Sequence, residues 1–331
     1  MAAWPKKTLA TRPNPSENCP IITEIHPKPK CVHVIVNPAP SRKIPLLAIL
    51  NRHFRSAGIR WGISITHGDG DGHTLAEKAV ENGADVVGVY GGDGTVMEVA
   101  GGLLESNVPL LILPGGTGNV VAAELGIPEK LERACDLLCG KDEYRVRAID
   151  VGMIGERPFL LRVGAGFESE VVQDATRELK DQFGKWAYVF AGIKALQESK
   201  EVRYEIKLDG DREISESGVA FVVANSGRVG FGRVALAPEV GIDDGLLDVF
   251  ILKKNNLEAM IQLARQMMGL DKNPLGEVLP WLDASELVSH WTATEIEVKS
   301  DPPMEIQVDG DVIASTPTTM HVLPSALRVV V

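Results

Sequence analysis

The sequence predicts an α/β protein in two parts, a doubly wound parallel sheet followed by a mainly antiparallel β-sandwich. Two observations support this prediction. Between residues 32 and 139, short apolar strands alternate with amphipathic helices, a pattern typical of a parallel sheet covered by helices on both faces. After about residue 145, strands dominate and helices become few, which indicates antiparallel sheets packed as a sandwich or barrel.

Each expected element of the first part follows from its residue pattern. Short runs of β-branched and other apolar residues predict strands, and apolar residues every three or four positions predict helices. The expected strands cover residues 32–36, 61–66, 86–90 and 110–113, and the expected helices cover residues 44–57, 74–82, 96–104, 120–125 and 129–139. Ligands of such sheets bind at the carboxyl ends of the strands.

The second part follows from the same patterns and sets the domain division. Its expected strands cover residues 147–153, 159–164, 202–208, 218–224, 247–252, 294–298 and 304–308, and its expected helices cover residues 168–179, 186–198 and 257–268. A chain of 331 residues is long enough for two domains. We therefore predict a flexible proline-rich arm (1–29), an α/β domain (30–146) and a β-rich domain (147–331), whose final strand is free to return to the first domain.

Charge and hydropathy exclude some classes of protein. The net charge is −11, so nucleic acid is not an expected partner and any basic patch must be local. No apolar run reaches the length of a membrane-spanning helix, and the N-terminus lacks the apolar core of a secretory signal. We therefore expect a cytoplasmic protein. Cys135 and Cys139 predict core thiols rather than a zinc site, because further ligands are missing nearby in the sequence.

Two glycine-rich loops each follow an expected strand and precede an expected helix. Residues 91–95 read Gly-Gly-Asp-Gly-Thr and residues 115–119 read Gly-Gly-Thr-Gly-Asn. Glycines let backbone N–H groups approach phosphate oxygens, and a helix N-terminus adds a favourable dipole. Asp93 suits such a loop because it can hold Mg²⁺ or its water ligands beside the phosphates.

Each loop also has a simpler interpretation as a tight strand-to-helix turn. Thr95 and Glu98 have the spacing of a capping box, and Asn119 suits a helix N-cap. Two such loops on successive strands favour phosphate binding. Neither loop matches the Gly-Lys-Ser/Thr ending of a P-loop or the Gly-x-Gly-x-x-Gly of dinucleotide-binding folds.

Residues 87–95 and 113–119 resemble the two signature loops of the diacylglycerol kinase catalytic-domain family, which is related to sphingosine kinases, NAD kinases and phosphofructokinases. The chain departs from the family pattern at Met97, where asparagine is common, and at residues 39–42, where Ser-Gly is usual. The resemblance covers residues 30–331 and implies ATP and Mg²⁺ as cofactors, with Asp93 organising Mg²⁺. The residues that it places at the nucleotide are Asn37, Thr66, Gly91, Gly92, Gly94, Thr95, Glu98, Gly116, Thr117, Gly118 and Asn119.

The second domain resembles the family's lipid-substrate domain. Residues 243–248 resemble a segment that carries a structural Mg²⁺ in bacterial members, which implies Asp244 as its ligand, with a solvated turn as the alternative. Residues 309–311 read Asp-Gly-Asp where the family has Asp-Gly-Glu, so the resemblance implies Asp311, together with Asp309, as the general base for the lipid hydroxyl. Aspartate is one methylene shorter, which affects its reach. The same triplet recurs at 209–211, and Asp-Gly is also the ordinary signal of a hairpin turn.

The resemblance implies an ATP- and Mg²⁺-dependent lipid kinase that phosphorylates the hydroxyl of a diacylglycerol-like lipid during peripheral visits to a membrane surface. Members of this family form homodimers. The few charges in residues 260–282 predict a core segment or an element that touches the bilayer. Two alternatives stay open. One is an NAD kinase-like enzyme, although its Thr-x-Gly-Ser-like segment is not found, and the other is a nucleotide- or lipid-binding protein without turnover.

Overall fold

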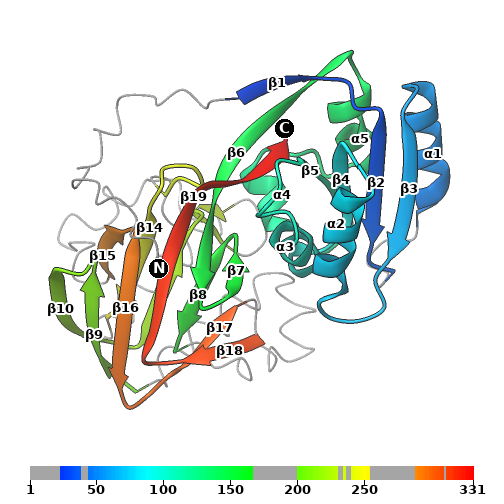
Figure 1. Cartoon of the computed structure of the whole chain (residues 1–331). Coiled ribbons are helices and arrows are strands. Elements are labelled where there is room, and N and C mark those ends of the chain that lie inside the picture. The colour runs from blue at the N-terminus through cyan, green and yellow to red at the C-terminus, as the bar shows by residue number, and fades with distance from the viewer. Residues whose placement is uncertain are drawn as a thin grey trace, which may run out of the picture.

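The computed structural model describes residues 23–38, 44–166, 200–229, 234–235, 240–253, 288–308 and 311–331, with the backbone alone at residues 228, 229, 234, 235 and 311. In this part of the chain, the two predicted kinds of architecture are both present (Figure 1). Helices surround a parallel sheet at one end of the molecule, and antiparallel sheets form the other end. The predicted fold class is confirmed.

The α/β part is built on four parallel strands in the order β5-β4-β2-β3. β4 and β5 are buried along their whole length, as expected for strands covered on both faces. Helices α1 and α5 pack together, and so do α2 and α3. The strands are β2 (Cys31–Val36), β3 (Arg60–Ile65), β4 (Val86–Gly91) and β5 (Leu110–Pro114), and the helices are α1 (Leu46–Ser56), α2 (Asp71–Glu81), α3 (Asp93–Gly101), α4 (Val120–Glu124) and α5 (Leu131–Cys139).

The same sheet continues from β5 into antiparallel strands, so it joins both parts of the molecule. β19 makes the junction, because its Val329 pairs in parallel with Leu110 of β5 while the strand also pairs antiparallel with β6 and β16. The remaining strands of this sheet are β1 (Thr23–Pro27), β6 (Glu143–Ile154), β7 (Arg157–Phe159), β9 (Val202–Leu208), β10 (Arg212–Gly218), β16 (Glu295–Asp301) and β19 (Thr318–Val330).

A second, antiparallel sheet has the order β15-β14-β11-β8-β17-β18. Apolar residues of β8, β11 and β14 form one buried cluster with residues of β9, β16 and β19, so the two sheets pack as a sandwich. The strands are β8 (Arg162–Ala165), β11 (Ala220–Ala224), β14 (Leu247–Leu252), β15 (Val288–Ala293), β17 (Glu305–Val308) and β18 (Asp311–Ser315), and a separate pair is formed by β12 (Arg228–Val229) and β13 (Val234–Ala235).

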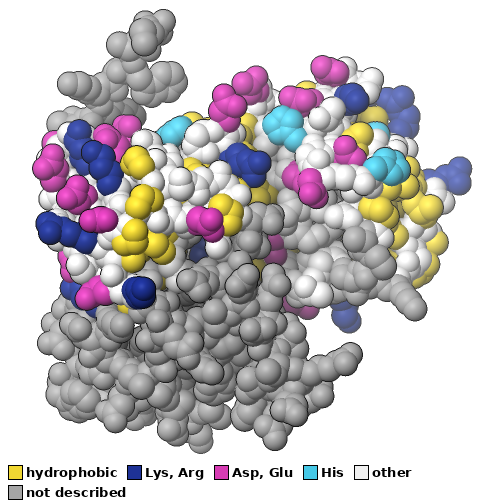
Figure 2. All heavy atoms as spheres, turned by 90° about the horizontal axis from the view of Figure 1, so that it is seen from below, with side chains coloured by type: hydrophobic (Ala, Val, Ile, Leu, Met, Phe, Trp, Pro, Cys, Tyr) yellow, Lys and Arg dark blue, Asp and Glu magenta, His cyan; other side chains and the backbone are white. Residues whose placement is uncertain are grey.

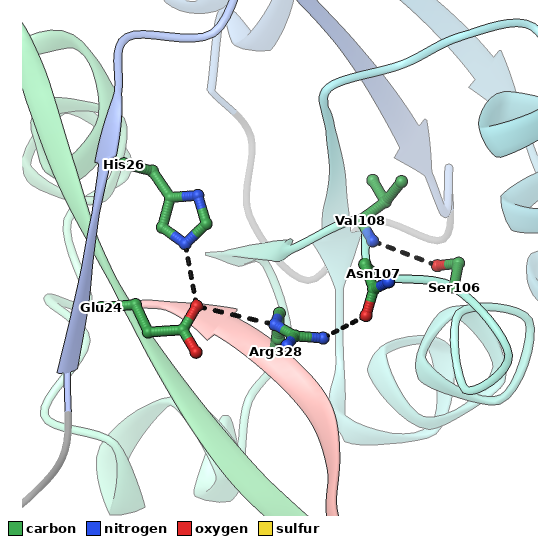
Figure 3. A network of polar contacts seen from close by, with 6 residues as sticks. All are labelled: Glu24, His26, Ser106, Asn107, Val108 and Arg328. Atoms are coloured by element: carbon green, nitrogen blue, oxygen red, sulfur yellow. Dashed lines mark hydrogen bonds and ion pairs between the residues drawn. The ribbon is translucent and has the colours of Figure 1, made fainter.

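Side chains tie β1 to strands distant in sequence (Figure 3). Oε2 of Glu24 lies 3.1 Å from Nε2 of His26 and 3.8 Å from Nε of Arg328 in β19. Arg328 also donates a hydrogen bond to the side-chain oxygen of Asn107, just before β5. The prediction of a flexible arm up to residue 29 is therefore wrong for Thr23–Pro27, because backbone pairing with β6 and this polar network hold β1 in the sheet.

Several element boundaries also differ from the prediction. Helices α2 and α3 begin at Asp71 and Asp93, three residues earlier than expected, because residues 71–73 and 93–95 are already helical. β6 runs from 143 to 154 and therefore crosses position 146, where the sequence suggested a domain boundary. The helices expected at 168–179, 186–198 and 257–268, and the segment 260–282, lie outside the described residues.

Candidate active site

The four parallel strands bring the predicted nucleotide residues to one edge of the sheet. Asn37 follows β2, Thr66 follows β3, and the glycine-rich loops follow β4 and β5. The backbone N–H of Asn37 donates to the carbonyl of Tyr90 at 3.0 Å, and that of Thr66 donates to the carbonyl of Val36 at 3.0 Å. Sequence-distant residues thus meet at the edge where parallel sheets bind ligands.

The two glycine-rich loops touch each other through their backbones. The N–H groups of Gly115 and Gly116 donate to the carbonyl of Gly91 at 3.0 and 3.1 Å. A Cβ added at Gly116 would lie 2.6 Å from Cα of Gly92, which no real side chain tolerates. Glycine at 116 is therefore needed for the close approach of the loops, and its N–H is already used within the protein.

Asp93 and Asn119 hold this pair of loops in shape. Oδ1 of Asp93 accepts the N–H of Val121 in α4 at 3.1 Å, so the first loop binds the helix that follows the second loop. Asn119 closes its own loop, because its Oδ1 accepts the N–H of Gly116 at 3.0 Å and its Nδ2 donates to the carbonyl of Gly116 at 2.9 Å. Asn119 stands at the N-cap position of α4, but its side chain makes no cap hydrogen bond.

The capping-box interpretation of Thr95 and Glu98 is wrong. Thr95 lies inside α3, is buried, and accepts a hydrogen bond from Nδ2 of Asn37 at 2.9 Å. Glu98 instead accepts the N–H of Gly72 in α2 at 3.0 Å. Both side chains therefore connect α3 to neighbouring elements, and they leave the first turn of α3 without a side-chain cap.

The uncapped first turn of α3 suits a phosphate group. Gly92 occupies the N-cap position, and Gly94 is exposed, so that a Cβ added there would meet no heavy atom within 4 Å. Backbone N–H groups at a helix N-terminus attract anions through their hydrogens and through the helix dipole. In the second loop, Gly118 lies next to the side chain of Asp93 in this turn, and its neighbour Thr117 is exposed. The residues present therefore fit a nucleotide phosphate.

Asp93 is the carboxylate that stands beside this phosphate cradle. A Cβ added at Gly118 would lie 2.9 Å from its Oδ2, so the carboxylate faces the second loop. Within the described residues, no group of three or more His, Cys, Asp or Glu side chains could hold a metal ion. Mg²⁺ commonly binds one or two carboxylates together with substrate phosphates and water. The residues fit Mg²⁺ that is shared with a nucleotide, and do not fit a cage made by the protein alone.

A second acidic region surrounds Asp244, between β13 and β14. Oδ1 of Asp244 accepts the N–H of Leu246 at 3.0 Å, within its own turn. Its neighbour Asp243 forms an ion pair with Arg147 at 2.8 Å. Asp150 of β6 is 1% exposed and accepts the N–H groups of Gly245 and Ser325 at 2.6 and 2.7 Å.

The sequence interpretation missed Asp150, although an acidic residue inside an apolar strand was the available signal. Burial raises the pKa of Asp150, the two N–H donors oppose that rise, and the charges of Asp244 and Asp243 add to it. A divalent cation near these oxygens would relieve the repulsion among the three carboxylates. These carboxylates do not form a group that could hold a metal ion by themselves, so a cation at Asp244 would need further oxygen ligands such as backbone carbonyls or water.

Asn225 follows the end of β11, beside Asp150, and is fully buried. Its Nδ2 donates to the carbonyls of Asp150 and Leu160 at 3.0 and 3.1 Å. Its Oδ1 finds no hydrogen-bond partner among the described residues. Asn225 therefore connects the end of β11 to the middle of β6 and to the residues that follow β7.

Two contacts connect the glycine-loop region to the β-rich part. The hydroxyl of Ser226 donates to Oε2 of Glu124 in α4 at 3.0 Å, and Met97 of α3 packs against the sandwich core. The two contacts therefore link α3 and α4, the helices that follow the glycine-rich loops, to the β-rich part.

Both Asp-Gly-Asp triplets lie where two consecutive antiparallel strands are joined, β9 to β10 and β17 to β18. Asp209 and Gly210 have positive φ values of 51° and 82° and form the turn between β9 and β10, as the hairpin interpretation predicts. Asp209 also accepts hydrogen bonds from Thr294 and Glu295. Asp311 begins β18, where its backbone pairs with Val308, while Asp309 lies outside the described residues.

Comparisons with known proteins agree with this geometry. The sequence profile of the diacylglycerol kinase catalytic domain matches residues 31–154, and that of the YegS C-terminal NAD kinase beta sandwich-like domain matches residues 162–331. A diacylglycerol kinase of Bacillus subtilis is 30% identical over 287 residues, which cover 85% of this chain and 90% of that protein.

Two further relatives extend the comparison. An uncharacterized protein of Synechocystis is 32% identical over 255 residues, which are 76% of this chain but only 56% of that longer protein. A crystal structure from Bacillus anthracis, of a protein provisionally assigned as a diacylglycerol kinase, superposes with a TM-score of 0.74 at 25% identity and covers 92% of this chain and 97% of that one.

Proposed function

We propose, because this chain belongs to the family of the diacylglycerol kinase catalytic domain, that it is a lipid kinase which transfers the γ-phosphate of ATP to a lipid hydroxyl. One observation carries the proposal most directly. Two glycine-rich loops touch at the carboxyl edge of a parallel sheet, beside a helix N-terminus without a side-chain cap. That arrangement suits the phosphates of a nucleotide.

The residues divide into groups with distinct roles. The N–H groups at the start of α3, around Gly92 and Gly94, would bind phosphate oxygens, and Gly118, Thr117 and Thr95 would border them. Asp93 would hold Mg²⁺, which supplies charge neutralisation at the phosphates when it is bound. Gly116 and Asn119 would act by fixing the loop, since their hydrogen bonds are internal.

The remaining nucleotide residues lie around this cradle. Asn37 would act through its hydrogen bond to Thr95, and Thr66 and Gly91 line the same sheet edge. Glu98 would position α2 against α3 through Gly72. Asp244 would carry a structural Mg²⁺ away from the reaction. These assignments rest on hydrogen bonds that keep the strand ends in one arrangement.

Asp311, with Asp309, is proposed as the general base. A carboxylate at the start of β18 would accept the proton of the lipid hydroxyl as the oxygen attacks the γ-phosphorus and ADP leaves. In-line transfer then depends mainly on positioning and on charge neutralisation. Because the acceptor is a membrane lipid, the enzyme would work at a bilayer surface. Among the described helices, none is both long and apolar enough to span a membrane.

The decisive experiment follows labelled γ-phosphate from Mg-ATP into a panel of lipids in mixed micelles, with NAD as a control acceptor. Asp93→Ala and Asp311→Ala are compared with Asp211→Ala, which removes the matching aspartate of the ordinary β9–β10 hairpin. We expect a labelled lipid with the wild type and Asp211→Ala, and a loss of at least about a hundredfold with the other two variants. Label in NAD, or turnover in Asp311→Ala equal to wild type, would contradict the assignment.

A further inference from the structure

An exposed surface on the outer edge of the α/β part has unusual composition. Its members are Leu47, Asn51 and Arg55 of α1 together with Ile63 and Ile65 of β3, and we refer to it as the α1–β3 surface. Leu47 is 58% exposed, Ile65 46% and Ile63 37%. These are three of the five large hydrophobic side chains that are exposed in the described part of the chain. Their gathering at one edge calls for an explanation, since single exposed hydrophobic residues are ordinary.

The fold places these five residues on one continuous strip. Leu47, Asn51 and Arg55 are spaced by four residues, so they lie one above another along α1. Ile63 and Ile65 share a face of β3 with Trp61, and Trp61 contacts Phe54 of α1 with ring centroids 5.9 Å apart. The helix of a strand–helix–strand crossover runs antiparallel to its strands, so Leu47 lies level with Ile65 and Arg55 level with the start of β3.

The strip therefore has an apolar end and a basic end. The apolar end is adjacent to Thr66, at the edge of the sheet that bears the glycine-rich loops. At the other end, Arg52, Arg55 and Arg60 are exposed. Helix α1 contains no acidic residue, and no ion pair to Arg52 or Arg55 forms within the described residues. An acidic side chain that lies against α1 is that of Asp136 in α5, whose Oδ1 is 3.3 Å from Nδ1 of His53. The exposed arginines therefore give a protein of net charge −11 a local basic region beside this ion pair.

Figure 2 shows the face that bears the carboxyl ends of the parallel strands. Hydrophobic side chains gather at its right-hand end, where α1 and β3 lie in Figure 1, and basic side chains project around that end. The nearest acidic residues of the following loop are Asp69 and Asp71. The carboxylate of Asp71 accepts the N–H groups of His67 and Gly68 at 2.7 and 3.0 Å. β3 is also the last strand of its sheet on this side.

We propose that the α1–β3 surface docks the protein on an anionic phospholipid bilayer. The aliphatic side chains of Leu47, Ile63 and Ile65 enter the interfacial layer, while Arg55 and its neighbours meet lipid phosphates. Apolar burial and attraction to anionic lipids are the two terms that hold peripheral proteins on membranes. The inference rests on the proposed function for its purpose, because docking there brings the glycine-loop edge toward the bilayer that contains the substrate.

The test is co-sedimentation with vesicles of phosphatidylcholine alone, or of equal parts phosphatidylcholine and phosphatidylglycerol, without nucleotide. Variants are Leu47→Gln, Ile65→Thr and Arg55→Gln, with Ile25→Thr as the matched control, since Ile25 is 61% exposed on β1 away from this surface. We expect binding to the anionic vesicles by the wild type and by Ile25→Thr. Each aliphatic substitution should weaken it roughly tenfold and Arg55→Gln roughly fivefold. Circular dichroism verifies that each variant is folded.

Two outcomes would overturn the proposal. One is equal binding by wild type, Ile65→Thr and Leu47→Gln, or no binding by the wild type. The other is that these substitutions convert a wild-type dimer to a monomer in analytical ultracentrifugation, which would assign the surface to a second copy of the chain. The binding assay contains no ATP, and the kinase assay in micelles needs no bilayer. A failure of docking is therefore distinct from a failure of the proposed reaction.

Discussion

The carboxylate of Asp93 accepts the backbone N–H of Val121 at 3.1 Å, which joins the first glycine-rich loop to the helix that follows the second one. Asp93, which is predicted to organise Mg²⁺, therefore also fixes the position of α4 relative to the first loop. A loss of activity on removal of the side chain would not tell these two roles apart, because the metal ligand and the hydrogen-bond acceptor would be lost together. Substitutions that separate charge from hydrogen bonding are needed.

Asp93→Asn separates these two roles. Its amide oxygen can still accept the N–H of Val121, so we expect the free energy of unfolding to stay within about 1 kcal/mol of wild type, whereas Asp93→Ala should lose about 1–3 kcal/mol. Phosphoryl transfer should fall in both variants because both lack the charge that holds Mg²⁺. Urea denaturation and Mg²⁺-dependent turnover measure the two effects. Full activity in Asp93→Asn would contradict a metal role.

Glu98 is expected to act on the packing of helices rather than on the nucleotide. Its carboxylate accepts the N–H of Gly72 at 3.0 Å, and Glu98→Ala would leave that donor without its partner. We expect a loss of about 1–3 kcal/mol in stability, while Glu98→Gln, which keeps an acceptor oxygen, should lose less. The KM for ATP in Glu98→Gln should remain near that of wild type. A large rise in that KM would instead indicate direct nucleotide contact.

Mg²⁺ is expected to stabilise the protein through Asp244. A ligand that binds the folded state alone adds roughly 2.7 kcal/mol when its free concentration is about 100 times Kd. Asp244→Asn should lose this Mg²⁺-dependent rise in Tm. Asp243→Asn is the matched control, because Asp243 is engaged by Arg147 at 2.8 Å. It should lower Tm without Mg²⁺ and keep the rise with Mg²⁺. Equal responses of both variants would argue for an ordinary turn at Asp244.

The sequence predicted the α/β half well because its strands and helices carry local signals. Strands such as β4 and β5 are continuous apolar runs, and each is followed by a loop with recognisable glycines. Strand β10 was missed because its residues are largely polar. A final strand free to return to the first domain was expected, and β19 does pair with β5, but its bounds were not predicted. β19 owes its place to pairing with β5, β6 and β16, and non-local pairing leaves little trace in a local pattern.

The candidate site shows the same limit. The glycine-rich loops were identifiable from spacing, but the use of individual side chains was not. Thr95 and Glu98 have a capping-box spacing, yet Asn37 and Gly72, from other elements, engage them in the fold. Asp150 was overlooked because its partners, Gly245 and Ser325, are distant in sequence. Hydrogen bonds between separate segments decide which polar residues have a structural role.

Tyr204 offers a test of the sandwich core. It is fully buried, it stacks on Phe221 with centroids 5.7 Å apart, and its hydroxyl has no hydrogen-bond partner among the described residues. Removing an unpaired buried polar group should stabilise the fold, so Tyr204→Phe should raise the free energy of unfolding by about 1–2 kcal/mol. Tyr204→Ala should lower it by about 3–5 kcal/mol. A loss of stability in Tyr204→Phe, seen by urea denaturation, would reveal a partner for the hydroxyl.

The thiols of Cys135 and Cys139 should be unreactive in the folded protein. Burial raises the pKa of each thiol from 9.0 to about 12, and the charge of Asp136 adds to the rise at Cys139. Since each pH unit of that rise lowers the thiolate fraction tenfold, labelling by a thiol reagent at neutral pH should be roughly a thousandfold slower than after unfolding. Because the folded pKa is raised, the contribution of the neutral thiols to stability is complete below pH 9.0 and is lost as the pH rises toward about 12. The measurement uses a Cys19→Ser, Cys31→Ser double variant, so that only this pair reports. Fast labelling without urea would mean that α5 opens readily from the core.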